Sequence, residues 1–486
     1  MPRPSAKGMA QPSVDQSTRL DSVLSIRKGR LYVEACEALE LAEQFGTPLY
    51  VISETQLRQN FRRYLAAFRQ RWPEGPVRVL PSIKANFSLA LRAILTSEGA
   101  GCDTFGEGEW FAAMSSGVSP ALISVNGSSK SRELLEQAIE AGARITLDSE
   151  MELELVREIA RAKGRRASVR FRLRPRYSEL RQPSDFDPAG ATVRDLARRY
   201  KPGIPTEVLR RVGRKALDAP ELDVTGVMVH LGRHSTDLEV WRGMVRSVVD
   251  VLSDLKQAWG GWEPGEIDLG GGFASPRDPT GRLTPQGQSR PLDALAPTPE
   301  EYAEALTSTL RSELERRGLI AEGKALEIEP GRALYADAGL HLTSVRHVKS
   351  QQDPIPYRWV ETDTSEMFLL DSLVEHNRWT PIAVGRAAAP PTHTADIVGI
   401  SCGFDVVVPQ ARLPEVEPGD VLALLDTGAY QDACANNFNA LPRPGTVLVR
   451  GAEAEWIKRP ETIEDVFRRD QIPSRLKRPG GLAEGR

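Results

Sequence analysis

Apolar residues in the first two thirds of the chain form short uninterrupted runs, separated by longer stretches in which they recur every three or four positions. The short runs are typical of buried strands and the longer stretches of amphipathic helices. The predicted strands are 30–33, 48–53, 77–83, 101–105, 122–125, 144–147, 167–173, 224–230, 266–269 and 325–329. The predicted helices are 36–45, 53–72, 88–98, 107–116, 130–141, 149–163, 237–258 and 298–317. This alternation predicts a parallel sheet, and the number of strands from Leu49 onward favours a (β/α)8 barrel over an open sheet.

The pattern changes after Leu334, where the helical periodicity fades. Short runs between Pro and Gly turns predict an all-β, Greek-key-like domain there, closed by a helix at 462–470. Its expected strands are 339–349, 359–363, 394–400, 421–425 and 446–450. We therefore expect a disordered tail (1–25), a segment joining the β domain (26–45), the barrel (46–324), the β domain (325–470) and a mobile tail (471–486). The Pro- and Arg-rich segments 175–205 and 276–297 are predicted insertions at the barrel rim.

Composition narrows the class of protein. The 63 Lys and Arg residues and 66 Asp and Glu residues leave a formal charge of −3, which argues against nucleic-acid or membrane partners. The four cysteines are widely spaced, which favours reduced thiols in a cytoplasmic protein over a disulfide framework or a metal site. The N-terminal segment lacks the apolar core of a signal peptide, and no run is long enough to cross a membrane.

One lysine stands out, because Lys84 ends the apolar run VRVLPSIKAN (77–86). A buried ammonium needs a partner or a covalent use, and burial lowers its pKa and frees the amine as a nucleophile. On this stretch alone, a lysine whose head group simply reaches the surface is the more common explanation of the pattern, and only the rest of the chain favours the covalent use.

Other chemical residues also follow predicted strands. They are Asp103, His230, the glycines Gly270, Gly271 and Gly272, and the turn Glu329-Pro330-Gly331-Arg332. Because the carboxyl ends of barrel strands meet at one face, we expect these residues to converge on Lys84. A glycine triplet is a tight turn or a phosphate cup, and its place after a late strand favours the phosphate.

Ten motifs in order now reveal a resemblance. They are GTPLYV (46–51), SIKAN (82–86), GCDTFGEGE (101–109), VNGSSK (125–130), LDSE (147–150), VMVHLG (227–232), IDLGGGF (267–273), EPGR (329–332), ISCGFD (400–405) and DTGAY (426–430). Together they closely resemble the fold-type III, pyridoxal-phosphate-dependent decarboxylases, the group that acts on diaminopimelate, ornithine or arginine. The resemblance extends from about residue 29 to 470, including NFNALPRP (437–444).

The resemblance implies a cofactor, pyridoxal 5′-phosphate, and a role for each matching residue. Lys84 would carry the cofactor, with Asp103 beside it, and His230 would lie against the ring. Glu329 would pair with the pyridine nitrogen and keep it protonated. The phosphate would be held by Gly270, Gly271, Gly272, Gly331, Arg332 and Tyr430. Taken alone, His230 and Glu329 are also ordinary residues for strand ends.

The resemblance also implies a homodimer with shared active sites, in which the loop 400–405 completes the partner's pocket. Cys402 would then be the acid that returns a proton after carbon dioxide leaves, with a buried structural thiol as the alternative. Contacts to an amino-acid substrate would come from Arg332, Cys402, Gly403, Phe404, Asp405 and Tyr430.

Departures from the family pattern concern the substrate. The family's Cys-Glu-Ser-Gly-Asp reads Cys402-Gly403-Phe404-Asp405, so the glutamate that recognises the distal amino group of diaminopimelate is missing. Where the family has Tyr-Ala-Val before the lysine, this chain has Pro81-Ser82-Ile83. The family's serine after the histidine motif is replaced by Arg233, with Ser235 nearby, and a family asparagine is replaced by Arg174. We therefore expect decarboxylation of a different, specialised amino acid. Racemisation, elimination or cyclisation with the same cofactor, and a non-catalytic cofactor-binding relative, are the alternatives.

Overall fold

The computed structural model describes residues 18–19, 22–174, 201–230, 232, 236–277, 296–374, 377 and 379–476. Most of the predicted N-terminal tail, most of both insertions, Arg233, Ser235 and residues 477–486 lie outside this set. The tail prediction needs a correction at its end, because Thr18–Arg19 and Leu24–Arg27 form strands. No described helix is both long and apolar enough to cross a lipid bilayer. All four cysteines are free thiols, two buried and two exposed.

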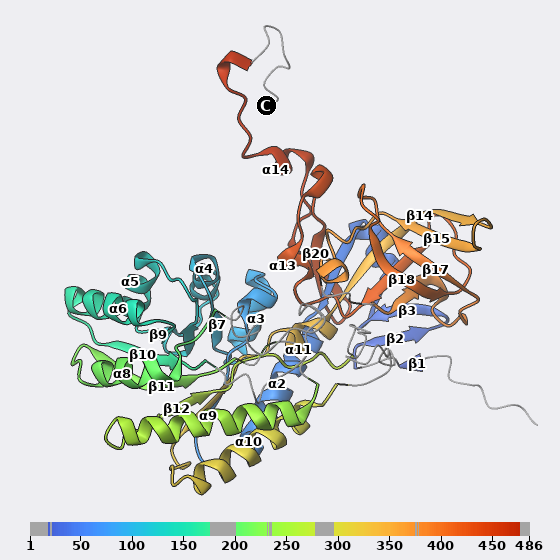
Figure 1. Cartoon of the computed structure of the whole chain (residues 1–486). Helices are drawn as coiled ribbons and strands as arrows, with labels where there is room; N and C mark the ends of the chain where they lie inside the picture. Colours follow the sequence, from blue (N-terminus) through green and yellow to red (C-terminus); the bar gives the residue numbers. More distant parts are fainter. Residues whose placement is uncertain are drawn as a thin grey trace, which may run out of the picture.

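Eight parallel strands form the first domain. In chain order they are β6 (Val77–Val79), β7 (Cys102–Thr104), β8 (Ile123–Val125), β9 (Arg144–Leu147), β10 (Ala167–Arg172), β11 (Leu222–Met228), β12 (Glu266–Asp268) and β13 (Ala325–Ile328). From β7 to β13 each strand pairs with the next, and β13 pairs with β6. An isolated bridge between Ser82, which follows β6, and Asp103 of β7 connects the two ends of the sheet. The prediction of a (β/α)8 barrel is confirmed, as a near-closed barrel (Figure 1).

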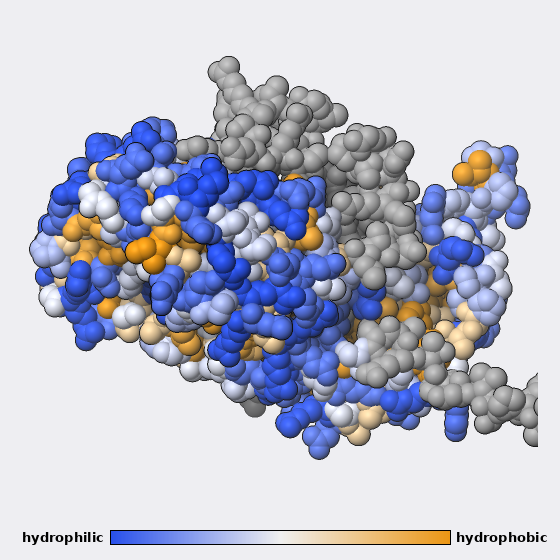
Figure 2. Space-filling model, turned by 90° about the horizontal axis from the view of Figure 1, so that it is seen from below, coloured by the Kyte–Doolittle hydropathy of each residue, from blue (hydrophilic) through white to orange (hydrophobic). Residues whose placement is uncertain are grey.

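Helices follow the strands and cover the outside of the barrel (Figure 1). They are α3 (Leu89–Ser97), α4 (Glu107–Ser115), α5 (Arg132–Ala141), α6 (Glu150–Lys163), α8 (Thr206–Leu217), α9 (Leu238–Ala258), α10 (Pro299–Arg316) and the short α11 (Arg332–Tyr335). Buried aliphatic and aromatic residues fill the layer between strands and helices. Figure 2 shows that the opposite, outer side of the barrel is mostly hydrophilic, with small apolar patches, as expected of solvent-facing helices.

The predicted domain boundaries need a correction. Strand β5 (Leu49–Ser53), which we assigned to the barrel, pairs with two strands of the β domain, whereas β13, which we assigned to the β domain, closes the barrel. Both runs are buried throughout, so hydrophobicity alone does not reveal the sheet to which each belongs. Helix α2 (Glu54–Arg71) carries the chain from β5 across to β6.

The second domain is a mostly antiparallel nine-stranded sheet. Besides β5 it contains β14 (Gly339–Gln351), β15 (Tyr357–Thr362), β16 (Pro381–Ala383), β17 (His393–Val398), β18 (Val406–Leu413), β19 (Val421–Leu425), β20 (Gly445–Arg450) and β21 (Glu453–Lys458). A small sheet of β1 (Thr18–Arg19), β2 (Leu24–Arg27), β3 (Arg30–Val33) and β4 (Cys36–Glu37) precedes α1 (Ala38–Phe45). This N-terminal segment packs on the β domain through a shared apolar core, and α14 (Ile463–Phe467) follows the last strand.

Candidate active site

Lys84 lies on a short 3₁₀ turn (Ile83–Ala85) directly after β6. Its Nζ donates to Asp103 Oδ2 at 2.9 Å and to the Ser82 hydroxyl, and Ser82 Oγ donates to the same carboxylate oxygen at 2.6 Å. The Asp103 side chain is 3% exposed, whereas that of Lys84 is 42% exposed. Burial opposes the charge on Lys84, but the carboxylate of Asp103 raises the lysine pKa above its usual value. The expectation that burial lowers this pKa is therefore wrong for the free side chain.

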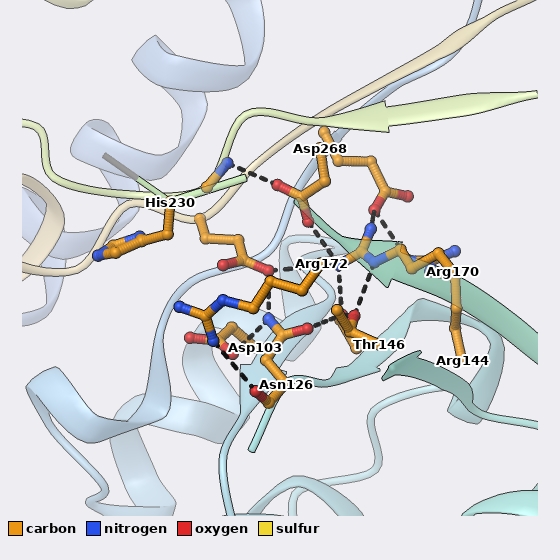
Figure 3. A network of polar contacts seen from close by, with 12 residues as sticks. Asp103, Asn126, Arg144, Thr146, Arg170, Arg172, His230 and Asp268 are labelled. Carbon is orange, nitrogen blue, oxygen red and sulfur yellow. Dashed lines mark hydrogen bonds and ion pairs between the residues drawn. The ribbon is translucent and has the colours of Figure 1, made fainter. Parts of the chain in front are cut away.

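A chain of hydrogen bonds connects Asp103 to Glu329 through Asn126 (Figure 3). Asn126 Nδ2 donates to Asp103 Oδ1 at 2.7 Å and to Glu329 Oε1 at 2.6 Å, and Ser124 Oγ donates to Asn126 Oδ1 at 2.8 Å. Burial alone would raise the pKa of Asp103, but the charge of Lys84 and hydrogen bonds from Ser82 and Asn126 hold it below the usual range. The prediction that Lys84, Asp103 and Glu329 converge is confirmed.

The pKa of Glu329 is shifted in the opposite direction to that of Asp103. Burial, together with the negative charges of Asp103 and Asp268, raises the pKa of Glu329 well above its usual value. Its closest cation among the described residues is Arg170, whose guanidinium is 3.4 Å from Glu329 Oε1. A carboxyl group placed in this way favours a nearby positive charge or hydrogen-bond donor, which is what a pyridine nitrogen provides.

Arg170 anchors this network from inside the barrel (Figure 3). It is fully buried and pairs with Asp268 at 2.5 Å and with Glu327 at 2.6 Å, while its Nε donates to Thr146 Oγ1 at 2.8 Å. Sequence analysis missed Arg170 and Asn126. The alternation in ASVRFR (167–172) does carry a signal, because it places the two arginines of β10 on the face opposite to Val169 and Phe171.

More ion pairs lie at the other end of the barrel interior. Arg144 pairs with Glu266 at 3.0 Å and Glu327 at 2.9 Å, and Arg78 pairs with Glu327 at 2.7 Å. Barrel interiors are ordinarily filled by branched apolar residues. Here several charges compensate one another inside the barrel, below the residues that meet at its carboxyl end.

In the glycine turn after β12, more of the backbone N–H groups are engaged in hydrogen bonds within the protein than we predicted. Gly270 N donates to Asp268 Oδ1 at 2.7 Å and Gly271 N donates to His230 Nδ1 at 3.1 Å, so these two amides already have partners. A Cβ at residue 270, 271 or 272 would come within 2.3, 2.3 or 2.6 Å of a backbone oxygen. Close backbone approach therefore requires all three glycines. A phosphate would meet the Gly272 amide, which has no partner among the described residues.

His230 follows β11 and is held by the hydrogen bond from Gly271. Burial, with the charges of Lys84 and Arg172, lowers the pKa of His230 to about 3. The imidazole is therefore neutral, and its Nδ1 is the acceptor. A neutral ring at this place is suited to lie against an aromatic cofactor.

Two more predicted residues meet across the domain boundary. The Arg332 guanidinium lies 4.6 Å from the centre of the Tyr430 ring and forms an ion pair of 2.6 Å with Asp371. A Cβ at Gly331 would lie 3.1 Å from Tyr430 Oη, so a glycine leaves room at this point. Tyr430 N donates to Ala85 O at 2.6 Å, which ties the β domain directly to the turn of Lys84.

The loop 400–405 lies apart from this cluster. Cys402, Gly403 and Phe404 are exposed, and Phe404 is 97% exposed. Within the described part of the chain, no hydrogen bond or ion pair joins the loop to the turn of Lys84. Instead, Cys402 N donates to Asn439 Oδ1 at 2.9 Å, within the β domain.

The prediction for Asp405 needs a correction. We expected it to contact substrate, but it is buried at the base of the loop and accepts hydrogen bonds from Ser401 N at 2.6 Å, Glu366 N at 2.6 Å and Ser365 Oγ at 3.1 Å. Its role is to shape the loop. Arg174, which we placed at the barrel rim, is half-buried beside residues of α9.

Comparisons with known proteins agree with this geometry. Residues 55–336 match the family of the pyridoxal-dependent decarboxylases, specifically its pyridoxal binding domain. Diaminopimelate decarboxylase of Methanocaldococcus jannaschii is 32% identical over 463 residues, which are 94% of this chain and 98% of the relative. The enzyme of Methanothermobacter thermautotrophicus is 30% identical over 92% of this chain and 97% of its own.

Solved structures of pyridoxal-dependent decarboxylases are also similar to this chain. The crystal structure of diaminopimelate decarboxylase from M. jannaschii superposes with a TM-score of 0.82 at 31% identity, over 94% of this chain and 99% of that one. A second structure of that protein, in complex with L-lysine, also has a TM-score of 0.82. The chain therefore belongs to the pyridoxal-dependent decarboxylases, and it is a pyridoxal-phosphate-dependent amino-acid decarboxylase.

Proposed function

We propose that this enzyme releases carbon dioxide from an α-amino acid other than diaminopimelate, in an active site that two copies of the chain share. The supporting observation is the continuous set Lys84, Asp103, Asn126 and Glu329 at the carboxyl end of the barrel. The residues fit pyridoxal phosphate, since a lysine, a buried carboxyl with a raised pKa and a glycine cradle surround one space. When bound, the cofactor supplies an electron-withdrawing ring that accepts the electron pair of the departing carboxylate.

The residues at the strand ends have different roles. Lys84 is the attachment point for the cofactor and also the amine that must exchange with the substrate amine. Asp103 holds the proton on Lys84 Nζ when the lysine is free, which keeps the released amine close at hand. Asn126, which bonds to both Asp103 and Glu329, fixes the distance between the lysine end and the pyridine end.

Glu329 is the partner of the pyridine nitrogen. Arg170 and Asp268 hold the position of this carboxyl from inside the barrel, so that no reorganisation is needed when charge develops on the ring. Neutral His230 would lie against the ring face, and the phosphate would be held by Gly272, Gly331, Arg332 and Tyr430. The ion pair with Asp371 holds the Arg332 guanidinium in place beside the Tyr430 ring.

The second copy supplies the loop 400–405. An exposed Phe404 and an exposed thiol on one loop make sense if the loop enters the pocket of a partner subunit. Cys402 would then be the acid that returns a proton to the α-carbon. A closed two-fold dimer makes both sites equivalent. The four free thiols agree with the reducing cytoplasm as the place of action.

Carbon dioxide release from a panel of amino acids by the purified holoenzyme tests the proposal. It separates decarboxylation from racemisation, elimination and cyclisation, none of which releases carbon dioxide by itself. For meso-diaminopimelate we expect kcat/KM below about 10⁴ M⁻¹s⁻¹, the lower end of ordinary enzymes, because Gly403 offers no carboxylate. A higher value for meso-diaminopimelate would show that the substrate is the same as that of the relatives.

A further inference from the structure

The turn 426–430, which follows β19, has an unfavourable backbone conformation at both of its ends. Asp426 has a φ of 66° and Tyr430 a φ of 67°, in the left-handed region that residues other than glycine rarely adopt. Between them, a Cβ at Gly428 would lie 2.0 Å from Tyr335 O, so the backbone is also closely packed. A backbone of this kind persists only where the surrounding structure holds it. The contacts of the turn therefore decide where the Tyr430 side chain lies.

Arg277, from the barrel, holds the first residue of this turn with a two-pronged ion pair. Its Nη2 donates to Asp426 Oδ1 at 2.7 Å, and its Nε donates to Asp426 Oδ2 at 2.8 Å. The Asp426 side chain is 2% exposed, so the carboxylate is bound almost out of contact with water. Charge-assisted bonds in this fork arrangement fix direction as well as distance. Arg277 therefore sets both the position and the orientation of the start of the turn.

The other end of the turn is held by the segment that carries Lys84. Tyr430 N donates to Ala85 O at 2.6 Å, and Asn86 Nδ2 donates to Gly428 O at 3.0 Å. These bonds fix the backbone at the end of the turn, and the ion pair fixes it at the start. A short turn that is held at both ends keeps its unfavourable conformation and leaves its last side chain a single direction.

Arg277 is itself anchored to the glycine turn after β12. It is five residues beyond Gly272, and residues 273–275 between them are buried. Ser275 Oγ donates to Arg277 O at 2.6 Å, which fixes the backbone at this point. One buried stretch of the barrel therefore connects the glycine turn with the turn 426–430 of the β domain.

We propose that Arg277 is a positioning residue, which acts through Asp426 to place the Tyr430 hydroxyl for the cofactor phosphate. The Gly272 amide would bind the same phosphate from the barrel side, so the ion pair sets the spacing between two phosphate ligands from different domains. That spacing matters because a hydrogen bond weakens when its donor and acceptor are more than about 3 Å apart. The inference rests on the proposed function, which assigns Tyr430 to the phosphate.

The test is the affinity of the full chain for pyridoxal phosphate after removal of the cofactor, measured by absorbance titration. Arg277→Met and Tyr430→Phe should each raise Kd by about 10-fold or more, as for a hydrogen bond to a charged group. If Arg277 acts through Tyr430, the double variant should bind no more weakly than the weaker single variant, because the two losses are then not additive. Arg277→Lys keeps the charge without the fork and should recover part of the affinity.

Arg71→Met is the matched control. Arg71 is 26% exposed, against 28% for Arg277, and it pairs with Glu304 elsewhere on the barrel, so its loss should leave the cofactor Kd unchanged. Asp426→Asn breaks the proposed pair from the other side and should give the same result as Arg277→Met, which provides a second variant if the first does not fold.

Two results would overturn the inference while leaving the proposed function intact. One is an unchanged Kd for Arg277→Met or Asp426→Asn when Tyr430→Phe weakens binding. The other is a double variant in which the losses of Arg277→Met and Tyr430→Phe add, since Arg277 would then act independently of the tyrosine. An unchanged Kd for Tyr430→Phe would instead show that the proposed role of Tyr430 at the phosphate is wrong, and the inference would fall with it.

Discussion

The two ends of the site are built in different ways. At the cofactor end, side chains from β7, β8, β10, β12 and β13 contact one another directly, and Asp103, Asn126 and Arg170 are almost completely buried. At the proposed substrate end, the hydrogen bonds given for the loop 400–405 among the described residues stay within its own domain, and Cys402 and Phe404 are exposed. In the proposed dimer, rigid strands would fix the chemistry of the cofactor, whereas a loop that enters the partner subunit would carry substrate choice. The predictions below test this contrast.

Replacing Lys84 should have the largest effect. We expect Lys84→Ala to reduce activity by on the order of 10⁴-fold or more, as for loss of a central reacting group. Borohydride reduction of the wild-type holoenzyme should add the pyridoxyl mass to the peptide that contains Lys84, measured by mass spectrometry. Label on a different lysine would show that the cofactor end is assigned wrongly.

Replacing Glu329 should weaken the electronic support of the cofactor without removing it. Glu329→Gln keeps the shape but not the charge, and we expect kcat to fall by roughly 10²–10³-fold, the range for a lost electrostatic contact at a reacting group. The cofactor absorbance should shift at the same time, since the protonation of the ring changes. An unchanged spectrum and rate would place the pyridine nitrogen elsewhere.

Arg170 tests whether the cofactor end is preorganised by buried charge. Arg170→Met leaves Asp268 and Glu327 without their shared cation, and loss of one partner of a buried pair typically costs about 3–5 kcal/mol of the free energy of unfolding. Arg210→Ala is the control, because its pair with Asp254 is exposed and should change stability by less than about 1 kcal/mol. Similar small changes in both denaturant titrations would contradict the network's role.

The smallest expected effect concerns Glu109, in the first turn of α4. Burial and the charge of Asp103 raise the pKa of Glu109 to about 7, from the value of 4.5 that is usual for a glutamate. Between these two pH values the folded state binds more protons at this residue than the unfolded state, so its contribution to stability falls as pH rises. His230, with its lowered pKa, contributes with the opposite sign between pH 3 and 6.5. Relative to wild type, Glu109→Gln should therefore gain stability as pH rises from 4.5 to 7; parallel curves would exclude the raised pKa.

Sequence reasoning located the repeating barrel well, because strands with uniform burial and capped amphipathic helices leave clear patterns. It failed for β5 and β13, because the hydrophobic runs of these two strands look alike. Each belongs to the domain other than the predicted one. It also missed β18, where Pro409 interrupts an apolar run; the strand lies at the edge of its sheet, where a proline is tolerated.

The residues of the site were predicted unequally. Lys84, Asp103 and Glu329 could be found because motifs mark them. Arg170 could not, because its importance depends on Glu327, a neighbour distant in the chain. A charge inside a barrel is visible only when the fold is known.

The measurement that tests the shared site most directly is subunit mixing. The Lys84→Ala and Cys402→Ala variants, each inactive as a homodimer, are combined under conditions in which subunits exchange. If each site takes Lys84 from one chain and Cys402 from the other, random exchange should restore about a quarter of full activity, since half of the dimers then hold one intact site. No recovery, despite exchange proven by mass spectrometry, would mean that both residues serve the same subunit's site.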